Sequence, residues 1–257
     1  MRGKATNITV VLPALNEEVA VGAQVTGLWA HERLRRLGLV DVIVVDNGST
    51  DATVEVAQMA GARVIHEPRR GYGAACLAGV RAVAPGQIVL LMDADGSDDL
   101  NGAARVVELV MRGEADLAMG ARTRGQVERG ALTPQQRAGN ALAVFLLRLL
   151  AGVRVSDLGP VRAVRRERLL ALDMHEMTYG WSTEMLLKAG RAGYRVIEVP
   201  VDYYQRAGGE SKVAGTWRGT IGAGRVILAT LWRYARWQPV SKVDTTPESV
   251  PVTEGAG

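Results

Sequence analysis

Short apolar runs alternate with helical patterns along the first half of the chain. The runs are rich in Val, Ile and Leu, they are too short to form helices, and polar or glycine-containing residues follow each of them. Continuous apolar strands separated by helices are typical of βαβ units, whose parallel sheet is buried on both faces. The sequence therefore predicts an α/β fold with a mostly parallel sheet flanked by helices. The expected strands are residues 8–13, 41–46, 62–67, 88–93 and 115–122, and one helical pattern covers 17–37.

The second half of the chain has longer helical patterns and a single expected strand. Apolar helical patterns cover residues 133–152 and 181–193, a strand is expected at 194–204, and a last helix is expected at 217–237. Because nothing resembles a linker, we expect one domain over residues 1–238, with a first half at 1–125 and a second at 126–238. The polar, proline-containing tail at 239–257 is expected to be disordered.

The balance of charge and the single cysteine narrow the class of protein. A net charge of +4 and a pI of about 9.4 suggest an anionic partner, which could be nucleic acid, a phosphate ligand or a lipid head group. One cysteine excludes an internal disulfide framework and fits a reducing compartment. The sequence has no apolar stretch typical of a signal peptide or a spanning helix, so we expect a cytoplasmic protein.

Polar side chains follow four of the expected strands: Glu17, Asp46, Asp93 with Asp95, and Arg122. In a parallel sheet the carboxyl ends of the strands share one edge, where ligands bind. Carboxylate oxygens spaced as in "DAD" at 93–95 suit Mg²⁺ or Mn²⁺, and Mg²⁺ often completes its coordination with substrate phosphates. The sequence predicts a metal-bound diphosphate at this edge, and the alternative is a solvated acidic turn that caps the next helix.

Two basic, glycine-containing segments could bind the same anion. "RRGYGAA" at 69–75 places Arg70 and Gly71 before a helix, whose backbone N–H groups can bind phosphate. It is neither a full dinucleotide fingerprint nor a P-loop. "QRAGGESK" at 205–212 places Arg206 and Lys212 in a loop that could close over a phosphate, or that could be an ordinary solvated loop.

In this order, these segments resemble glycosyltransferase family 2, which has the GT-A, Rossmann-like fold, and especially its dolichyl- and polyprenyl-phosphate sugar synthases. The resemblance implies a metal-dependent inverting transfer of a hexose from a UDP- or GDP-linked sugar to a polyprenyl phosphate. It also assigns the nucleotide-sugar to residues 1–125 and the acceptor to 126–238. The matching stretches are "VVLPALNEE", "VIVVDNGSTD", "GYGAA", "LLMDADGSDD", "MGAR", "SDLGPVRAVRRE" and "EVPVDYYQRAGGESKVAGT", over about residues 8 to 216.

The resemblance also implies roles for individual residues. Those implied for the nucleotide-sugar pocket are Pro13, Ala14, Leu15, Glu17, Asp46 at the base, Arg70, Gly71, Asp93 at the ribose, and Ala94. Those implied for the reaction are Asp95 as metal ligand with Asp93 beside it, Arg122 and Arg137 at the acceptor, and Arg206 and Lys212 at the phosphates. The chain departs from the family pattern at Asn47, where Asp is usual, and at Ser97, where this branch often has Gln.

The kind of acceptor depends on whether a general base is present. A hydroxyl acceptor needs a base within hydrogen-bond reach, whereas an ionised phosphate does not. Family members with hydroxyl acceptors often have Asp where this chain has Ser182, which favours a phosphate acceptor. Glu184 and Asp157 are the remaining base candidates, and each could instead be structural. A small hydroxyl acceptor therefore stays open, as does a catalytically silent nucleotide-sugar-binding protein, while nucleic-acid binding is disfavoured because the basic residues lack an aromatic platform.

The last expected helix is amphipathic. At 100° per residue, one face carries arginines and the opposite face carries large apolar side chains, which is typical of a helix that lies on an anionic membrane surface. The sequence thus predicts a peripheral membrane protein, and the alternative is a helix packed on the domain or in a homo-oligomer interface. The arginines are Arg218, Arg225, Arg233 and Arg236, and the apolar residues are Ile227, Leu228, Leu231, Tyr234 and Trp237.

Overall fold

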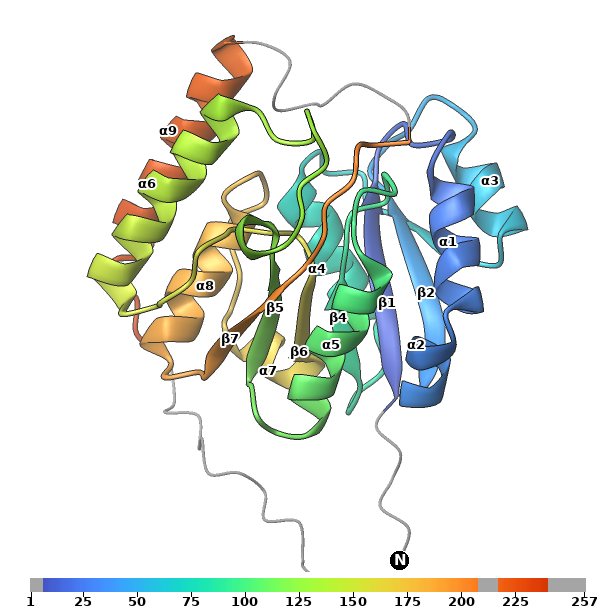
Figure 1. Ribbon diagram of the computed structural model, residues 1–257, viewed down its shortest axis with the longest axis horizontal. Coiled ribbons are helices and arrows are strands. Elements are labelled where there is room, and N and C mark those ends of the chain that lie inside the picture. Colours follow the sequence, from blue (N-terminus) through green and yellow to red (C-terminus); the bar gives the residue numbers. More distant parts are fainter. Residues whose placement is uncertain (1–6, 208–216, 240–257) are drawn as a thin grey trace, which may run out of the picture.

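A computed structural model describes residues 7–207 and 217–239 and has one seven-stranded sheet flanked by helices (Figure 1). The strand order is β3-β2-β1-β4-β6-β5-β7. Neighbouring strands are parallel except around β6, which is antiparallel to both β4 and β5. The expected α/β fold with a mostly parallel sheet is therefore confirmed. The strands are β1 (Ile8–Ala14), β2 (Leu39–Asp46), β3 (Arg63–His66), β4 (Ile88–Leu91), β5 (Leu117–Ala121), β6 (Arg162–Arg165) and β7 (Val196–Pro200).

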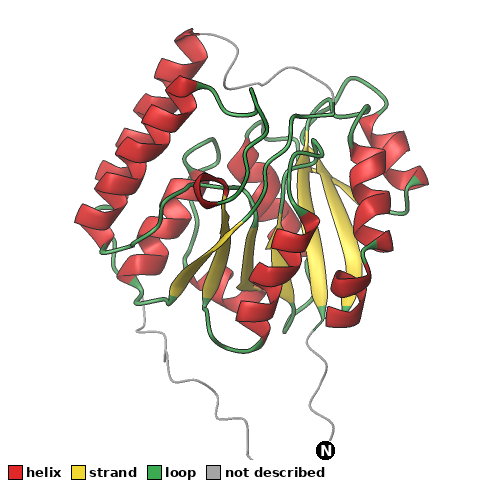
Figure 2. Ribbon diagram, viewed as in Figure 1, coloured by secondary structure: helices red, strands yellow, loops and turns green. Residues whose placement is uncertain are grey.

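Helices cover both faces of the sheet, as Figure 2 shows. The single helix expected at 17–37 is wrong, because the backbone of His31 is extended and its ring accepts a hydrogen bond from the Leu34 amide, which starts a second helix. The helices are α1 (Val21–Ala30), α2 (Glu32–Leu37), α3 (Thr53–Met59), α4 (Tyr72–Ala82), α5 (Leu100–Met111), α6 (Pro134–Ala151), α7 (Arg166–Ala171), α8 (Trp181–Arg191) and α9 (Trp217–Tyr234), with a 3₁₀ turn at Arg122–Arg124.

Sequence analysis missed β6 and α7; β6 lies inside the stretch "VRAVRRE", and α7 begins in it at Arg166. The strand has only four residues, with arginine at both ends, so its polar letters hide its burial. Arg162 at its start is nevertheless 1% exposed, because its guanidinium donates to backbone carbonyls. The antiparallel β6 is placed between β4 and β5, and it joins the two halves of the chain in one sheet.

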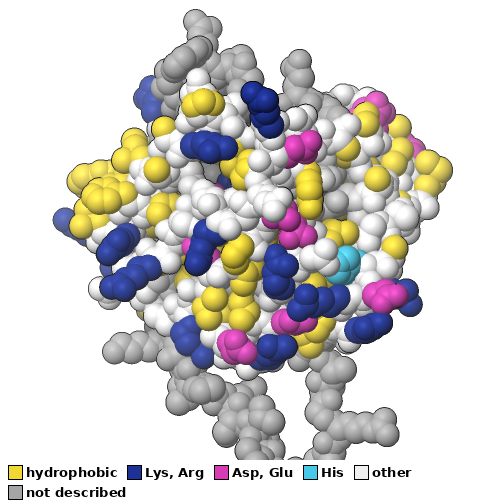
Figure 3. Space-filling model, viewed as in Figure 1, with side chains coloured by type: hydrophobic (Ala, Val, Ile, Leu, Met, Phe, Trp, Pro, Cys, Tyr) yellow, Lys and Arg dark blue, Asp and Glu magenta, His cyan; other side chains and the backbone are white. Residues whose placement is uncertain are grey.

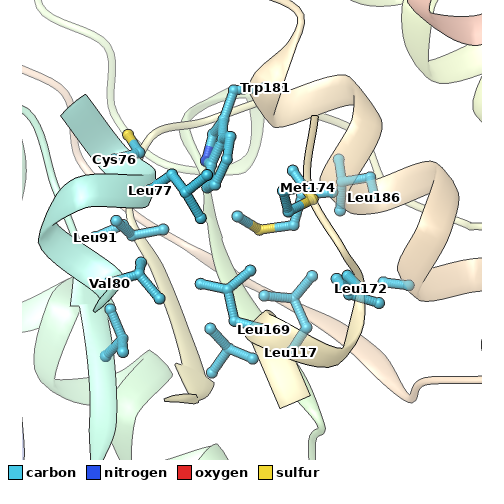
Figure 4. Close-up of a cluster of buried hydrophobic side chains, with 14 of the residues drawn as sticks. Cys76, Leu77, Val80, Leu91, Leu117, Leu169, Leu172, Met174, Trp181 and Leu186 are labelled. Carbon is cyan, nitrogen blue, oxygen red and sulfur yellow. The ribbon is translucent and has the colours of Figure 1, made fainter. Parts of the chain in front are cut away.

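Two apolar clusters lie on opposite faces of the sheet. Alternate residues of β2 divide between them, since Ile43 and Val45 belong to one cluster and Val42 and Val44 to the other. Figure 4 shows the first cluster, in which Leu77 of α4 lies beside Trp181 of α8, and Leu186 of α8 lies next to Met174. Burial on both faces explains why the central strands β1 and β4 are continuous apolar runs.

The helices α6 and α9 pack side by side beyond α8, at one end of the sheet (Figure 1). The predicted C-terminal amphipathic helix is present, but much of its apolar face is covered by the domain: Leu231 and Tyr234 are buried in the first cluster, and Ile227 packs against that cluster. These three residues follow the alternative of packing on the domain, Leu228 stays exposed, and contact of the helix with a membrane remains a prediction. Within the described residues, no helix is both long enough and apolar enough to cross a membrane.

Some predictions fall outside what the structure describes. Lys212 lies in the undescribed stretch 208–216, and the tail expected to be disordered lies almost wholly within the undescribed residues 240–257. The side chain of Arg218 on α9 is likewise outside the described set. The division of the domain at residue 125 remains a prediction.

Candidate functional site

A cavity of about 530 Å³ opens at the carboxyl ends of β1 and β4, where the sequence predicted a ligand site. It gathers side chains from the sheet edge, from α4, α8 and α9, and from the segment after β7. The predicted site residues that line it are Pro13, Ala14, Leu15, Glu17, Arg70, Gly71, Asp93, Ala94, Asp95, Arg122, Ser182 and Arg206. A smaller cavity of about 230 Å³ adjoins it, and this one is lined by Arg137 and Asp157 and shares Arg122.

Asp95 is a buried carboxylate with both oxygens engaged. Its Oδ1 accepts hydrogen bonds from the Ser97 amide at 3.0 Å and the Ser97 hydroxyl at 2.5 Å. Its Oδ2 forms an ion pair with Arg206 Nε at 3.0 Å. Ser97, which stands where the family branch often has Gln, therefore orients Asp95.

The other carboxylates of this acidic segment have distinct tasks. Asp98 Oδ2 accepts from the Asp93 amide at 2.9 Å and so closes the turn. Asp99 caps α5 by accepting from the Asn101 amide at 2.8 Å, as the capping alternative expected for this part of the segment. Asp93 and Asp95, by contrast, face the cavity. The segment is thus partly a helix cap and partly a ligand-facing edge.

Burial and mutual repulsion make Asp93 and Asp98 hard to ionise. Burial and, to a smaller extent, the charge of Asp95 raise the pKa of Asp93 to about 6, although Arg206 and Arg122 oppose the rise. Burial and the charge of Asp93 raise the pKa of Asp98 as well. Carboxylates crowded in this way favour a bound cation, and their oxygens suit Mg²⁺ or Mn²⁺. Among residues 7–207 and 217–239, no three carboxylate, imidazole or thiolate side chains are placed to enclose a metal, so substrate oxygens would have to complete its coordination.

The turn before α4 is held by Asn47. Its side-chain oxygen accepts from the Gly71 amide at 2.7 Å, and its amide nitrogen donates to the carbonyls of Glu67 and Arg69 at 2.9 and 2.8 Å. An aspartate could not donate these two bonds, which gives a local reason for Asn at this position. A Cβ on Gly71, whose φ is +142°, would lie 2.2 Å from the Met177 carbonyl oxygen, so glycine is required there.

Asp46 is not among the described residues that line the cavity, although the resemblance assigned it to the nucleotide base. It accepts from the Gly48 and Ser49 amides at 3.3 and 2.8 Å and lies 3.1 Å from His66 Nδ1. Burial alone would raise its pKa, but these hydrogen bonds outweigh burial and hold the pKa below its usual value. Its observed role is to shape the turn after β2.

Arg122 and Asp157 form a nearly buried pair at the wall between the two cavities. Asp157 Oδ2 accepts from Arg122 Nε at 2.8 Å, and Oδ1 accepts from Nη2 at 2.9 Å. Burial would raise the pKa of Asp157, but the bonds and charge of Arg122 lower it overall. The guanidinium also lies 5.0 Å from the centre of the Tyr203 ring. Arg122 is therefore fixed in orientation, and Asp157 is a poor proton acceptor.

Glu184 is fully buried and lies outside the residues that line the cavity. Its carboxylate accepts from the His175 amide at 3.0 Å and the Glu176 amide at 2.7 Å, and it pairs with Lys188 Nζ at 2.7 Å. Lys188 in turn donates to the Asp173 carbonyl and lies 4.5 Å from the Tyr234 ring centre. This arrangement corrects the view of Glu184 as a candidate base, since the carboxylate ties the 173–176 loop to α8.

Sequence analysis missed several residues of the cavity. Arg162 holds its wall by donating to the carbonyls of Leu158, Gly159 and Ser182. The aromatic "DYY" after β7 was noted only within an expected strand and a matching stretch, with no role of its own, and Arg137 was the one residue of α6 assigned to the site. The missed lining residues are Asn47, Tyr72, Ala75, Gln136, Leu158, Pro160, Thr178, Tyr179, Thr183, Tyr203 and Ile227.

The fold and the site together are those of an α/β protein with a charged cavity at the carboxyl edge of its sheet. The family model described as glycosyl transferase family 2 matches residues 9–173. An uncharacterised glycosyltransferase of Mycobacterium tuberculosis (strain ATCC 25618 / H37Rv) is 41% identical over 227 residues, which are 88% of this chain and 96% of that protein. A dolichyl-phosphate hexose transferase of Haloferax volcanii is 35% identical over 206 residues, 79% of this chain and 85% of the relative.

Solved structures of a glycosyltransferase are also similar to this chain. Glucosyl-3-phosphoglycerate synthase from Mycobacterium tuberculosis, in complex with Mn²⁺ and UDP-glucose, has a TM-score of 0.68 and 26% identity, covering 90% of this chain and 79% of that one. The same enzyme with Mg²⁺ and UDP has a TM-score of 0.69 and 28% identity, with the same coverage. The chain belongs to glycosyl transferase family 2 and is a glycosyltransferase with the GT-A fold.

Proposed function

We propose that the protein transfers a hexose, with inversion, from a UDP- or GDP-linked sugar to a polyprenyl phosphate, with Mg²⁺ or Mn²⁺ as cofactor. The observation that carries this proposal is the junction of the two cavities. The larger one has carboxylates at the sheet edge, the smaller one lies against α6 and α9, and Arg122 borders both. Along this path, the carboxylates suit a metal-bound donor, Arg122 suits an acceptor phosphate, and the surface against α6 and α9 suits an apolar tail.

The nucleotide-sugar would occupy the part of the larger cavity lined by Pro13, Leu15, Glu17 and the Arg70–Gly71 turn. Asp95, with Asp93 beside it, would hold the divalent cation, which when bound supplies Lewis-acid stabilisation of the leaving diphosphate. Arg70 and Arg206 would add positive charge where negative charge develops. Lys212 keeps its predicted role at the phosphates only as an expectation. The relatives' Mn²⁺ and Mg²⁺ complexes with UDP-glucose and UDP support this arrangement.

The positions of the carboxylates, and the cations with which they are paired, favour a phosphate acceptor over a hydroxyl acceptor. Those lining the larger cavity, Glu17, Asp93 and Asp95, all come from the donor half, and Ser182 occupies the position where a base would be expected. Asp157 is paired with Arg122 and Glu184 with Lys188, so neither is free to take a proton. An ionised phosphate oxygen needs no base to attack the anomeric carbon, and Arg122 would orient it.

The smaller cavity suits an apolar chain that continues from that phosphate. Its lining includes Leu132, Leu142, Ala143, Ile227 and Leu228, and it opens between α6 and α9. The relative named as a dolichyl-phosphate hexose transferase supports the same acceptor class. A second candidate acceptor is a small phosphorylated acid, which the similarity to glucosyl-3-phosphoglycerate synthase favours.

A transfer screen tests the proposal. Purified protein is incubated with UDP-glucose or GDP-mannose, with and without Mn²⁺, and with undecaprenyl phosphate, 3-phosphoglycerate or glycerol. We expect metal-dependent formation of a lipid-linked hexose, with the other two acceptors much poorer. Transfer only to phosphoglycerate or glycerol would contradict the lipid acceptor, and nucleotide-sugar binding without turnover in all arms would favour a silent binding protein.

The α6–α9 patch, defined as Leu142, Phe145, Leu149, Leu228 and Trp232, is the surface we propose to face anionic lipid. Phe145, Leu149 and Trp232 are 62%, 70% and 83% exposed, and the exposed Arg148 lies on the same face of α6. In Figure 3, hydrophobic side chains gather at the edge of the molecule over α6, with basic side chains beside them. Tryptophan, aliphatic and basic side chains together are typical of helices at membrane interfaces.

Replacing Phe145 and Trp232 with Glu should therefore lower co-sedimentation with anionic vesicles by about tenfold. Met59→Glu is the matched control, because Met59 is 80% exposed but lies on α3, far from α6 in Figure 1. Unchanged sedimentation of the double variant would contradict the lipid assignment. If the patch instead mediates the homo-oligomer alternative, the double variant would shift in analytical sedimentation without vesicles.

A further inference from the structure

The side chain of Arg206 occupies the one oxygen of Asp95 that a divalent cation would need. Oδ1 already accepts two hydrogen bonds from Ser97, so Oδ2 is the oxygen left for a ligand, and Arg206 Nε lies 3.0 Å from it. A guanidinium at this distance and a metal ion compete for that oxygen, because both are cations and repel each other at close range.

We propose that Arg206 is a displaceable counterion: it neutralises Asp95 in the free enzyme and moves to the diphosphate when a divalent cation arrives with the nucleotide. This inference deepens the proposed function and rests on it, since it takes Asp95 as the metal ligand. It adds a competition between the protein's own cation and the metal, so that metal and nucleotide bind cooperatively.

The backbone explains why Arg206 returns to this position. The Ala207 amide donates to the Asp95 carbonyl at 3.2 Å, and the Tyr204 amide donates to the Ser97 carbonyl at 3.0 Å. An isolated bridge between Asp98 and Tyr203 continues the pairing. Residues 203–207 therefore run alongside the acidic segment, and only the Arg206 side chain has to move.

The Asp95–Arg206 pair joins a buried carboxylate to a guanidinium that is partly exposed. The Asp95 side chain is 3% exposed and lies near Asp93 at the cavity, so it would be costly to leave without a cation. The Arg206 side chain is 32% exposed and also lines the cavity, so it has room to turn toward a ligand. The pair is stable without ligand yet open on one side.

The cooperativity between metal and nucleotide depends on which anion the Arg206 guanidinium contacts after it leaves Asp95. A metal ion that binds alone must separate Arg206 from Asp95 and brings no anion in exchange, so that the guanidinium is left with the charges of Asp93 and Glu17 nearby. A metal ion that binds with a diphosphate brings new anionic oxygens for Arg206 to contact. The free enzyme should therefore bind free metal weakly, and nucleotide should strengthen metal binding by the same factor as metal strengthens nucleotide binding.

The test is a Mn²⁺ titration followed by the electron paramagnetic resonance signal of free Mn²⁺, with and without UDP. Arg206→Gln removes the competing charge, so we expect its Kd for Mn²⁺ alone to be about 3- to 10-fold lower than that of the unsubstituted protein. In the presence of UDP the order should reverse, with Mn²⁺ bound about tenfold more weakly by the variant. Arg206→Lys, which keeps the charge, should behave like the unsubstituted protein.

Arg105→Gln is the matched control. Arg105 Nη2 lies 3.4 Å from Asp99 Oδ2. The change therefore removes one positive charge that is paired with the same acidic segment, and it leaves Asp95 paired with Arg206. We expect its Mn²⁺ affinity to stay within about twofold. Equal tightening by both variants, or no tightening by Arg206→Gln while UDP still promotes Mn²⁺ binding, would overturn the counterion role. If no variant binds Mn²⁺ even with UDP, the proposed metal-dependent function itself fails.

Discussion

Asp95→Asn is expected to lower the rate of sugar transfer by on the order of 10³-fold, because the change removes the carboxylate proposed to hold the divalent cation. Asn keeps the size of the side chain and can still accept from Ser97, so the turn should fold as before. In calorimetric titrations, the variant should bind UDP with the same affinity whether or not Mn²⁺ is present, whereas the unsubstituted protein should bind it more tightly with Mn²⁺.

Asp99→Asn separates this effect from a general loss of negative charge. Asp99 belongs to the same segment, but it caps α5 through the Asn101 amide and is not among the described residues that line the cavity. Because Asn is as good a cap as Asp, transfer should stay within a fewfold of the original rate. If both variants lose activity equally, or if Asp95→Asn keeps metal-dependent UDP binding, the role of Asp95 as metal ligand is contradicted.

Lys188→Met is expected to lower the free energy of unfolding by about 3–5 kcal/mol, since it leaves a buried carboxylate without its cation. Glu184 and Lys188 are both 0% exposed and 2.7 Å apart. For a domain of this size, such a loss lowers the melting temperature by roughly 10 °C. Differential scanning calorimetry at neutral pH would measure it.

A second variant tests whether Glu184 acts as an anchor or as a base. Glu184→Gln combined with Lys188→Met should recover much of the lost stability, because no uncompensated charge remains. At a temperature where the double variant is folded, kcat should stay within a fewfold, whereas loss of a general base costs roughly 10²- to 10⁴-fold. A loss of kcat of that size in a stable double variant would restore Glu184 as the base and favour a hydroxyl acceptor.

Sequence reasoning went furthest where local pattern and burial coincide. The strands β1, β2 and β4 are continuous apolar runs, and the polar groups that follow β1 and β4 converge on one cavity. In a parallel sheet the strand ends must meet at one edge, so linear spacing was enough to bring Glu17, Asp93 and Asp95 together. Asp46, at the end of β2, shows the limit of this reasoning, because its side chain turns back to the loop after its strand.

The features that sequence reasoning did not predict depend on which segments of the fold cover a given surface. The periodicity of a sequence carries no information about that cover. The apolar face of α9 was visible in the sequence, but not that α8 and the first core cluster bury Leu231 and Tyr234. Glu184 and Lys188 are spaced four residues apart, as in a solvent-exposed helical pair, yet the 173–176 loop and α9 enclose them. The pairing of Arg206 with Asp95 joins residues over a hundred positions apart, so the sequence could name both residues without connecting them.

The most direct measurement is a crystal structure of the protein grown with Mn²⁺ and a UDP- or GDP-linked sugar, with anomalous diffraction used to locate the manganese. The predicted result is a manganese peak within coordinating distance of Asp95, bridged to the diphosphate, with the sugar directed toward Arg122. A bound nucleotide-sugar whose diphosphate and manganese lie away from Asp95 would contradict the account.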